Sequence, residues 1–157
     1  MIQQHDEMPK GELQQLLNGE MLTHQTSELF ANKKVVLFAV PGAFTPTCSA
    51  AHLPGYVVSA DELKAKGVDE IICLSVNDAF VMQAWGESQN AENIMMLADG
   101  DGSYTKALGL SMDTAGFGGV RSQRYAMIID NGKVASLHIE APKSFEVSKA
   151  EVILDNL

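Results

Sequence analysis

The sequence has few of the features that mark membrane, nucleic-acid-binding or disulfide-rich secreted proteins. Two cysteines are too few for a disulfide framework, and a cytoplasmic chain would keep both as thiols. Eleven basic residues against 20 acidic ones leave a net charge of −9, which disfavours binding to nucleic acid or anionic lipid. The longest apolar runs, such as 35–40, are far shorter than the roughly 20 residues that span a bilayer.

The N-terminal residues also lack a targeting pattern. Residues 1–7 contain neither a basic region nor an apolar stretch, so we expect a cytoplasmic protein unless a leader has been removed. With 46% hydrophobic and 20% charged residues, the 157-residue chain is long enough to bury its own core. No repeat, linker or low-complexity stretch divides it, and we predict a single domain over residues 1–157.

Strand and helix patterns alternate along most of the chain. Residues 34–40 form an unbroken β-branched and apolar run, which is typical of a strand buried on both faces. Asn131-Gly132 separates two later apolar runs and predicts a hairpin. The other predicted strands cover residues 68–76, 94–97, 125–129 and 134–139. The predicted helices cover 46–66, with a kink or interruption at Pro54 and Gly55, then 78–85, 103–108 and 148–157.

The first 30 residues carry a separate hairpin signal. Leu13, Leu16 and Leu17 precede Asn18-Gly19, a strong type I′ turn sequence, although the leucine spacing also suits a helix. Together the patterns predict an α/β protein with a central sheet of mixed strand direction. Helices should cover both faces of that sheet, and a β-hairpin should extend it at the N-terminus.

Cys48 is the residue with the clearest chemical potential. It follows a buried strand and a turn rich in proline and glycine, and Pro46 is suited to begin a helix there. A cysteine in the first helical turn faces free backbone N–H groups and the positive end of the helix dipole, which stabilise thiolate relative to thiol. A partly exposed thiolate can attack a peroxide and become a sulfenic acid. The alternative is that Cys48 is a small apolar residue that fills the start of the helix.

Thr45 lies three residues before Cys48, where its hydroxyl could stand beside the sulfur. The same hydroxyl could instead cap the helix or end the loop, and the two roles are compatible.

Residues 41–49, Pro-Gly-Ala-Phe-Thr-Pro-Thr-Cys-Ser, followed by His52-Leu53-Pro54-Gly55, closely resemble the active-site segment of the peroxiredoxins. The spacing Pro-x-x-x-Thr-x-x-Cys is the signature of that family, and the neighbouring residues resemble its type II, or peroxiredoxin-five-like, subgroup. The likeness extends through 73–80, Trp85-Gly86 and 97–99 to Arg124. The resemblance implies a thioredoxin-like fold and the reduction of hydrogen peroxide or alkyl hydroperoxides, without a bound cofactor.

The resemblance also assigns roles to individual residues. Cys48 would be the peroxidatic nucleophile, Thr45 would hydrogen-bond the peroxide, and Pro41 would shield the sulfur from water. Arg124 would hold the thiolate and polarise the departing oxygen, which suits a side chain that stays charged at every working pH. Four further residues are expected to support substrate binding: Phe44, Thr47, His52 and Arg121.

The second cysteine, Cys73, lies in an apolar run, where a buried and inert thiol is the simpler interpretation. No cysteine follows it, so the late resolving cysteine of the animal type is missing. A bridge to Cys48 would need Cα atoms within about 7 Å. We therefore expect an external thiol to resolve Cys48. Resemblance to bacterial and plant members favours glutathione, with or without glutaredoxin, and thioredoxin second.

Other functions find little support in the sequence. Cys48 and His52 could share a metal, but zinc sites usually need four ligands and no cluster supplies the rest. A partial calcium-loop pattern at 99–103 has Tyr104 and Leu110 where Gly and Glu are required. A thioredoxin-like disulfide exchanger would need a cysteine at position 51, which is alanine. A non-catalytic chaperone or a redox-sensing binding protein on the same scaffold remains the alternative.

The resemblance finally implies a homodimer with its interface near the active-site loop. Three large apolar residues close to that loop are candidate anchors: Phe44, Phe80 and Trp85. Their simpler role is in the core.

Overall fold

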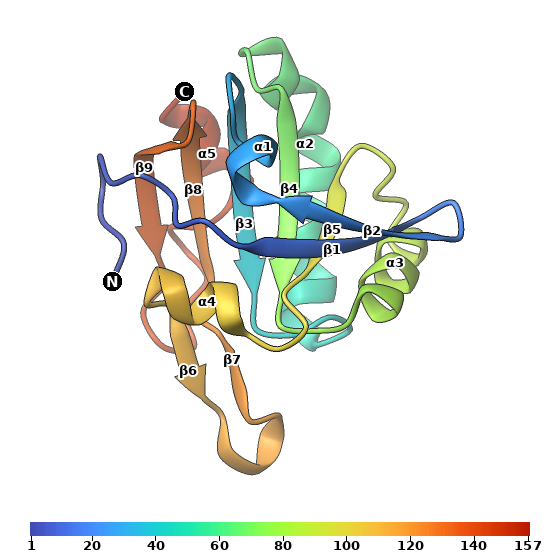
Figure 1. Ribbon diagram of the computed structural model, residues 1–157. Coiled ribbons are helices and arrows are strands. Elements are labelled where there is room, and N and C mark those ends of the chain that lie inside the picture. The colour runs from blue at the N-terminus through green and yellow to red at the C-terminus, as the bar shows by residue number, and fades with distance from the viewer.

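The computed structural model describes residues 1–157 and is built around one seven-stranded sheet (Figure 1). Along the sheet the strands follow the order β2-β1-β5-β4-β3-β8-β9. Their bounds are β1 Glu12–Leu17, β2 Glu20–Gln25, β3 Lys34–Val40, β4 Glu70–Ser75, β5 Met95–Ala98, β8 Tyr125–Asp130 and β9 Lys133–Ile139. Strands β3, β4 and β5 are parallel to one another, whereas β1, β2, β8 and β9 each pair antiparallel with their neighbours. The predicted mixed sheet is confirmed.

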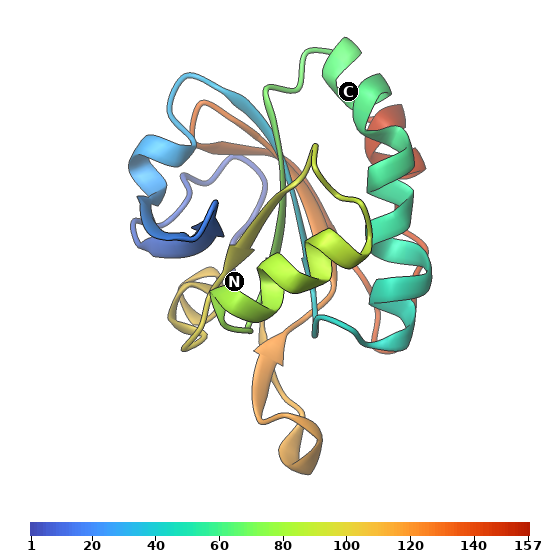
Figure 2. The same cartoon turned by 90° about the vertical axis from the view of Figure 1, so that its right-hand side faces the viewer.

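Helices cover both faces of the sheet, as Figure 2 shows from the side. Five α-helices are present: α1 Thr26–Leu29, α2 Leu53–Ala65, α3 Ala79–Ser88, α4 Ser103–Leu108 and α5 Ala150–Asp155. Side chains of α2, α3 and α5 share one core cluster, and those of α1 and α4 share a second. Strand β3 supplies Val36, Phe38 and Val40 to the first cluster and Val35, Leu37 and Ala39 to the second. The central strand is therefore buried on both sides, as its unbroken apolar sequence predicts.

The N-terminal hairpin is also confirmed. Asn18 and Gly19 both adopt positive φ, 52° and 80°, which is the backbone of a type I′ turn and favours these residue types. Strand β1 joins the hairpin to the edge of the sheet by pairing Gln14 with Ala98 of β5. The leucine spacing that also suited a helix is therefore strand spacing.

Two features differ from the sequence prediction. Residues 111–122 form a small separate hairpin, β6 Ser111–Asp113 and β7 Val120–Ser122, which projects from the body of the molecule (Figures 1 and 2). The glycine-rich residues 116–119 lie at the tip of this hairpin. The last helix begins at Ala150 rather than 148, because the carbonyl of Ser148 accepts from the side chains of His52 and Tyr56 instead of from a helical N–H.

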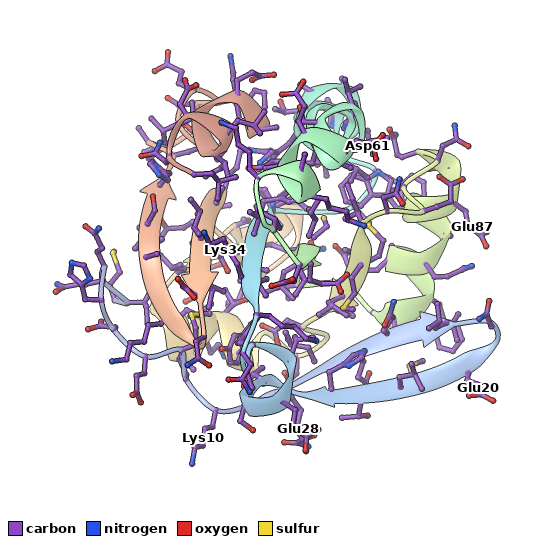
Figure 3. All side chains as sticks on the ribbon, turned by 90° about the horizontal axis from the view of Figure 1, so that it is seen from above. Lys10, Glu20, Glu28, Lys34, Asp61 and Glu87 are labelled. Atoms are coloured by element: carbon purple, nitrogen blue, oxygen red, sulfur yellow. The ribbon has the colours of Figure 1, made fainter.

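The excess of acidic residues lies on the surface. Glu20, Glu28, Asp61 and Glu87 are exposed acidic residues labelled in Figure 3. No helix is both long and apolar enough to cross a bilayer.

Candidate active site

A tight turn after β3 delivers Cys48 to the start of a helix. The strand ends at Val40 and the chain reverses through residues 41–45, with Phe44 at a φ of 63°. Pro46 takes the first helical position, as predicted, where a missing N–H leaves no helical bond unmade. Cys48 is thus the third residue of the helix, in the turn where the dipole and free N–H groups favour an anion.

A π-helical turn, Cys48–His52, joins this first turn to α2. The N–H of Leu53 donates to the carbonyl of Cys48, five residues earlier instead of the usual four. Pro54 follows at once and has no N–H to donate, so the wider turn falls where the α-helical bonding would be interrupted. The irregularity predicted at Pro54 is this π-turn rather than a break. Both Cys48 and His52, at its two ends, are fully buried.

Arg124 contacts the sulfur of Cys48 although the two residues are 76 positions apart in the sequence. Its Nη2 donates to Sγ of Cys48 over 3.1 Å, and its Nη1 lies 2.9 Å from Nδ1 of His52. The pairing of β8 with β3 brings Arg124 close to Cys48. Tyr125 lies opposite Ala39, near the turn that precedes the helix. Neither contact is with a carboxylate, so the guanidinium charge remains available to stabilise a thiolate.

His52 is a neutral acceptor with a fixed tautomer. Arginine can only donate, so Nδ1 of His52 accepts from Arg124 and Nε2 carries the proton. That Nε2 donates to the carbonyl of Ser148 over 3.1 Å, an acceptor shared with the hydroxyl of Tyr56 at 2.7 Å. Burial and then the charge of Arg124 lower the pKa of His52 to about 3, against smaller opposing effects of Ser148 and Glu140. His52 therefore holds Arg124 in place without carrying charge itself.

Thr45 shapes the loop rather than capping the helix. Its hydroxyl donates to the carbonyl of Gly42 over 2.7 Å, and its carbonyl accepts from the N–H of Ser49 over 2.9 Å. The hydroxyl proton is thus engaged within the loop, and the oxygen retains lone pairs for an incoming donor. Asn77 holds the same loop by accepting from the N–H of Ala43 over 3.0 Å.

Cys48 has no exposed surface, so its sulfur is not open to solvent. The side chain joins the core cluster that also contains Phe38 and Tyr56, and Arg124 lies against the sulfur. A pocket of about 480 Å³ lies beside the site. Its lining residues are Pro41, Thr47, Met112, Gln123, Arg124 and residues 140–145. Three of the predicted site residues therefore meet at one cavity.

Arg121 does not contact the sulfur. It lies within β7, where its Nη1 donates to the carbonyl of Val76 over 2.8 Å and its Nε donates to Gly118 over 3.0 Å. Its guanidinium ties the β6–β7 hairpin to the residue that follows β4. Its Nη1 also lies beside Gly42 of the active-site loop.

The three candidate interface aromatics differ in exposure. Phe44 is 57% exposed and Phe80 is 63% exposed, whereas Trp85 has no exposed surface. The expectation that Trp85 anchors an interface is therefore wrong. Its indole packs in the core at 6.5 Å from the ring of Phe44, and its N–H donates to the hydroxyl of Ser49 over 3.0 Å.

Cys73 is a buried free thiol in the middle of β4, opposite Phe38 of β3. Burial, with a smaller contribution from Cys48, raises the pKa of the Cys73 thiol well above its ordinary value. A protonated and inaccessible thiol is unreactive, in agreement with the interpretation from sequence.

Two residues of the site were not found from the sequence. The carbonyl of Ser148 holds His52, and the carboxylate of Glu140 accepts from both the N–H and the hydroxyl of Ser148. Neither residue belongs to a motif, because their partners are joined only by the fold. Asn77, by contrast, lies in the segment 73–80 that carries the family resemblance.

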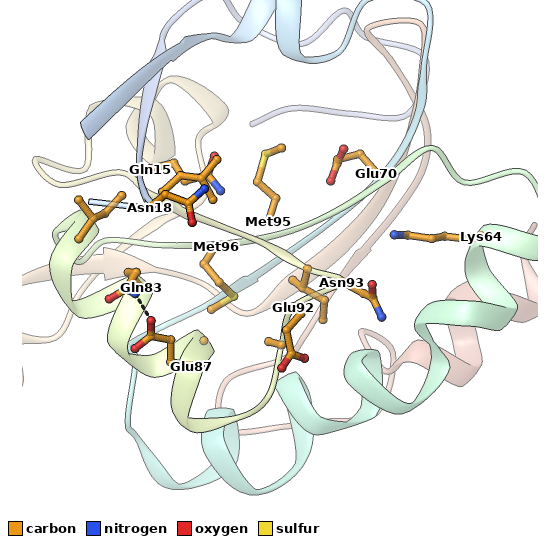
Figure 4. Close-up of a pocket in the computed structure, with 15 residues that line it drawn as sticks. Gln15, Asn18, Lys64, Glu70, Gln83, Glu87, Glu92, Asn93, Met95 and Met96 are labelled. Carbon is orange, nitrogen blue, oxygen red and sulfur yellow. Dashed lines mark hydrogen bonds between the residues drawn. The ribbon is translucent and has the colours of Figure 1, made fainter. Parts of the chain in front are cut away.

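A second pocket, of about 420 Å³, lies between the β1–β2 hairpin, α3 and β5 (Figure 4). Polar residues and six hydrophobic ones line it, among them Met95 and Met96, and none of the predicted site residues belongs to it. The structure contains no group of three or more His, Cys, Asp or Glu side chains that could hold a metal ion. Cys48 and its neighbours are thus the candidate active site.

Comparison with known proteins identifies the family. The redoxin family matches residues 3–154. Peroxiredoxin-2D of Arabidopsis thaliana is 51% identical over 142 residues, which cover 89% of this chain and 88% of that protein. A crystal structure of reduced Prx3 from Vibrio vulnificus in complex with hydrogen peroxide is 71% identical, with a TM-score of 0.98 and coverage of 99% of both chains. The oxidized form of Prx3 from Vibrio vulnificus is similar at a TM-score of 0.94, 72% identity and full coverage of both chains. The chain therefore belongs to the redoxin family, with the thioredoxin-like fold and the peroxidase activity of the peroxiredoxins.

Proposed function

We propose that the chain reduces hydrogen peroxide and alkyl hydroperoxides through the thiolate of Cys48. The observation that carries the proposal is the 3.1 Å contact from Arg124 to the sulfur, at the third residue of a helix. The sulfur attacks the terminal oxygen of the hydroperoxide, the O–O bond breaks, and the departing oxygen takes a proton to leave as water or an alcohol. Cys48 becomes a sulfenic acid.

The surrounding groups suit this step because charge moves from the sulfur to the leaving oxygen. Arg124 is a fixed, permanently charged donor that lowers the energy of both ends of that charge transfer. The oxygen of Thr45 is free to accept from the peroxide O–H, and Pro41 limits water at the mouth of the pocket. We infer that peroxide reaches the buried sulfur through the 480 Å³ pocket, past Thr47. The similarity to a relative described in complex with hydrogen peroxide supports this substrate.

We further propose that an external thiol resolves the sulfenic acid in two steps. The first thiol condenses with the sulfenic acid to form a mixed disulfide and water, and a second thiol releases the reduced enzyme. The burial of Cys73 in β4 supports an external partner. Glutathione, with or without glutaredoxin, is favoured because it is small enough for the pocket beside Cys48, and thioredoxin is the second choice. We place the reaction in the cytoplasm, where thiol reductants are abundant and both cysteines stay free.

We also propose a domain organisation and an oligomeric state for the chain. The match of the redoxin family over residues 3–154 supports a single domain that spans the chain. We also propose a homodimer whose interface includes Phe44 and Phe80, because both are large, apolar and exposed next to the active-site loop. Light scattering across micromolar concentrations should find a dimer, and a strictly monomeric profile would contradict it.

A peroxide-consumption assay tests the chemistry directly. The wild-type protein and Cys48→Ser are compared with two reducing systems, glutathione plus glutaredoxin and thioredoxin plus its reductase. We expect turnover only in the wild type, and faster with glutathione plus glutaredoxin. No turnover above background in either protein would favour the alternative, a non-catalytic chaperone or redox-sensing binding protein. Equal turnover in Cys48→Ser would show that the activity does not depend on Cys48.

A further inference from the structure

We propose that Glu140 is a positioning residue whose carboxylate fixes residues 146–148 and, through Ser148 and His52, holds Arg124 against the sulfur of Cys48. The inference rests on the proposed peroxidase function. It assigns a role to a residue directly after β9 that does not touch the sulfur.

The carboxylate of Glu140 is enclosed by donors from a single segment. Its Oε2 accepts from the N–H groups of Glu146, Val147 and Ser148 over 2.8, 2.9 and 2.8 Å. The hydroxyl of Ser148 donates to the same oxygen over 2.6 Å, whereas Oε1 accepts only from Glu146, over 3.0 Å. Glu140 is 8% exposed, and a charge this buried persists because such donors replace its water. The segment 146–148 is consequently fixed by one side chain.

Three successive hydrogen bonds connect the carbonyl of Ser148 to the sulfur of Cys48. The Ser148 carbonyl accepts from His52, His52 accepts from Arg124, and Arg124 donates to the sulfur. Glu140 also contacts Arg124 along the backbone, where its N–H donates to the Arg124 carbonyl over 3.0 Å. Arg124 is therefore held twice by Glu140, once at its main chain and once at its guanidinium through two intermediaries.

The residue directly before the segment 146–148 places an aromatic ring against His52 and Arg124. Phe145 lies 5.1 Å from the ring of His52, and the guanidinium carbon of Arg124 lies 5.8 Å from its centroid. Residues 140–145 form one wall of the pocket beside Cys48. Loss of the Glu140 carboxylate would release both the ring and the wall.

The protonation state of Glu140 agrees with this role. Burial alone would raise the pKa of the Glu140 carboxyl, but the hydrogen bonds from Ser148, Glu146 and Val147 together outweigh it and lower the pKa. The group stays ionised at neutral pH and keeps its acceptors available.

The proposal is tested with two variants, Glu140→Ala and Glu140→Gln. Asp99→Ala is the control. Asp99 is a matched control because it too is a buried carboxylate that accepts from two backbone N–H groups, those of Tyr104 and Thr105. Tyr104 and Thr105 belong to α4, which packs in the second core cluster, whereas Cys48 belongs to the first. The measurements are the second-order rate of oxidation by hydrogen peroxide, the pH midpoint of thiolate formation at Cys48 from its ultraviolet absorbance, and thermal unfolding.

We expect Glu140→Ala to slow oxidation about 10- to 100-fold and to move the thiolate midpoint to higher pH, because Arg124 loses its fixed position. Glu140→Gln should largely rescue both quantities, since its amide carbonyl can take the place of Oε2. Asp99→Ala should lower thermal stability and leave both quantities unchanged.

A folded Glu140→Ala protein with the wild-type rate and midpoint would overturn the proposal. If that variant does not fold, Glu140→Asp decides instead: its shorter side chain cannot reach every donor, and a wild-type rate would overturn the proposal equally. A wild-type protein that does not react with peroxide would instead refute the peroxidase function.

Discussion

The indole N–H of Trp85 donates to the hydroxyl of Ser49 over 3.0 Å, so a buried tryptophan is hydrogen-bonded to the residue that follows Cys48. It is also the only tryptophan in the chain. Any rearrangement of the π-turn at Cys48 must alter the surroundings of this one indole.

Trp85 emission should therefore change when Cys48 is oxidised and return when thiol is added. Stopped-flow fluorescence with excess peroxide measures the rate. The Cys48→Ser protein is the control, and a change of equal size in that variant would mean that the signal does not report on Cys48.

Replacement of Arg124 should remove most of the reactivity toward peroxide. Arg124→Lys keeps the charge but has a single nitrogen, which cannot match the two guanidinium nitrogens that reach His52 and the sulfur separately. We expect the second-order rate with hydrogen peroxide to fall about 100-fold or more, the usual effect of losing a preorganised donor. Arg121→Lys, whose partners are backbone carbonyls of Val76 and Gly118, should cost far less. Equal losses in the two variants would argue against a special role of Arg124.

Stability should fall with acidification because His52 is buried in its neutral form. Its pKa is about 3 in the folded protein against an ordinary 6.5, so the unfolded chain binds a proton first as the pH falls. The stabilisation is complete above about pH 6.5 and is lost progressively toward pH 3. Urea denaturation at several pH values should give a shallower decline for His52→Asn, which does not titrate. Parallel curves for the two proteins would contradict the assignment of a neutral, buried His52.

Cys73 should be dispensable for turnover. Because its thiol is fully buried in β4, Cys73→Ala should retain the wild-type rate with glutathione and glutaredoxin. Loss of the buried sulfur should lower the free energy of unfolding by about 1 kcal/mol. Mass spectrometry of the wild type after peroxide, without added thiol, should find no stoichiometric disulfide between Cys48 and Cys73. Such a disulfide, or loss of turnover in Cys73→Ala, would show that this thiol takes part.

Local sequence signals predicted most of the fold because they act within a few residues. The apolar run of β3, the Asn18-Gly19 turn and Pro46 at the start of the helix each have a direct physical cause in the neighbouring residues. The π-turn was predicted only as an irregularity, because Pro54 shows where bonding is interrupted but not how the helix compensates.

The site was predictable only where a motif covers it. The spacing of Thr45 and Cys48 is local, whereas Arg124 was identified through resemblance, since it lies 76 positions from Cys48. The burial of Cys48 and Trp85 depends on how α2 and α3 pack against the sheet, which no local pattern fixes. Glu140 could not be found at all, because its importance depends on donors that the fold brings to it.

Chemical trapping of the oxidised sulfur is the most direct test of the central claim that Cys48 attacks peroxide. The reduced protein is mixed with a stoichiometric amount of hydrogen peroxide in the presence of dimedone, which labels sulfenic acids, and the labelled residue is located by peptide mass spectrometry. The structure predicts rapid labelling at Cys48 alone, and much slower labelling in Arg124→Lys. Label on Cys73, or an unmodified Cys48 after the peroxide has been consumed, would contradict the account.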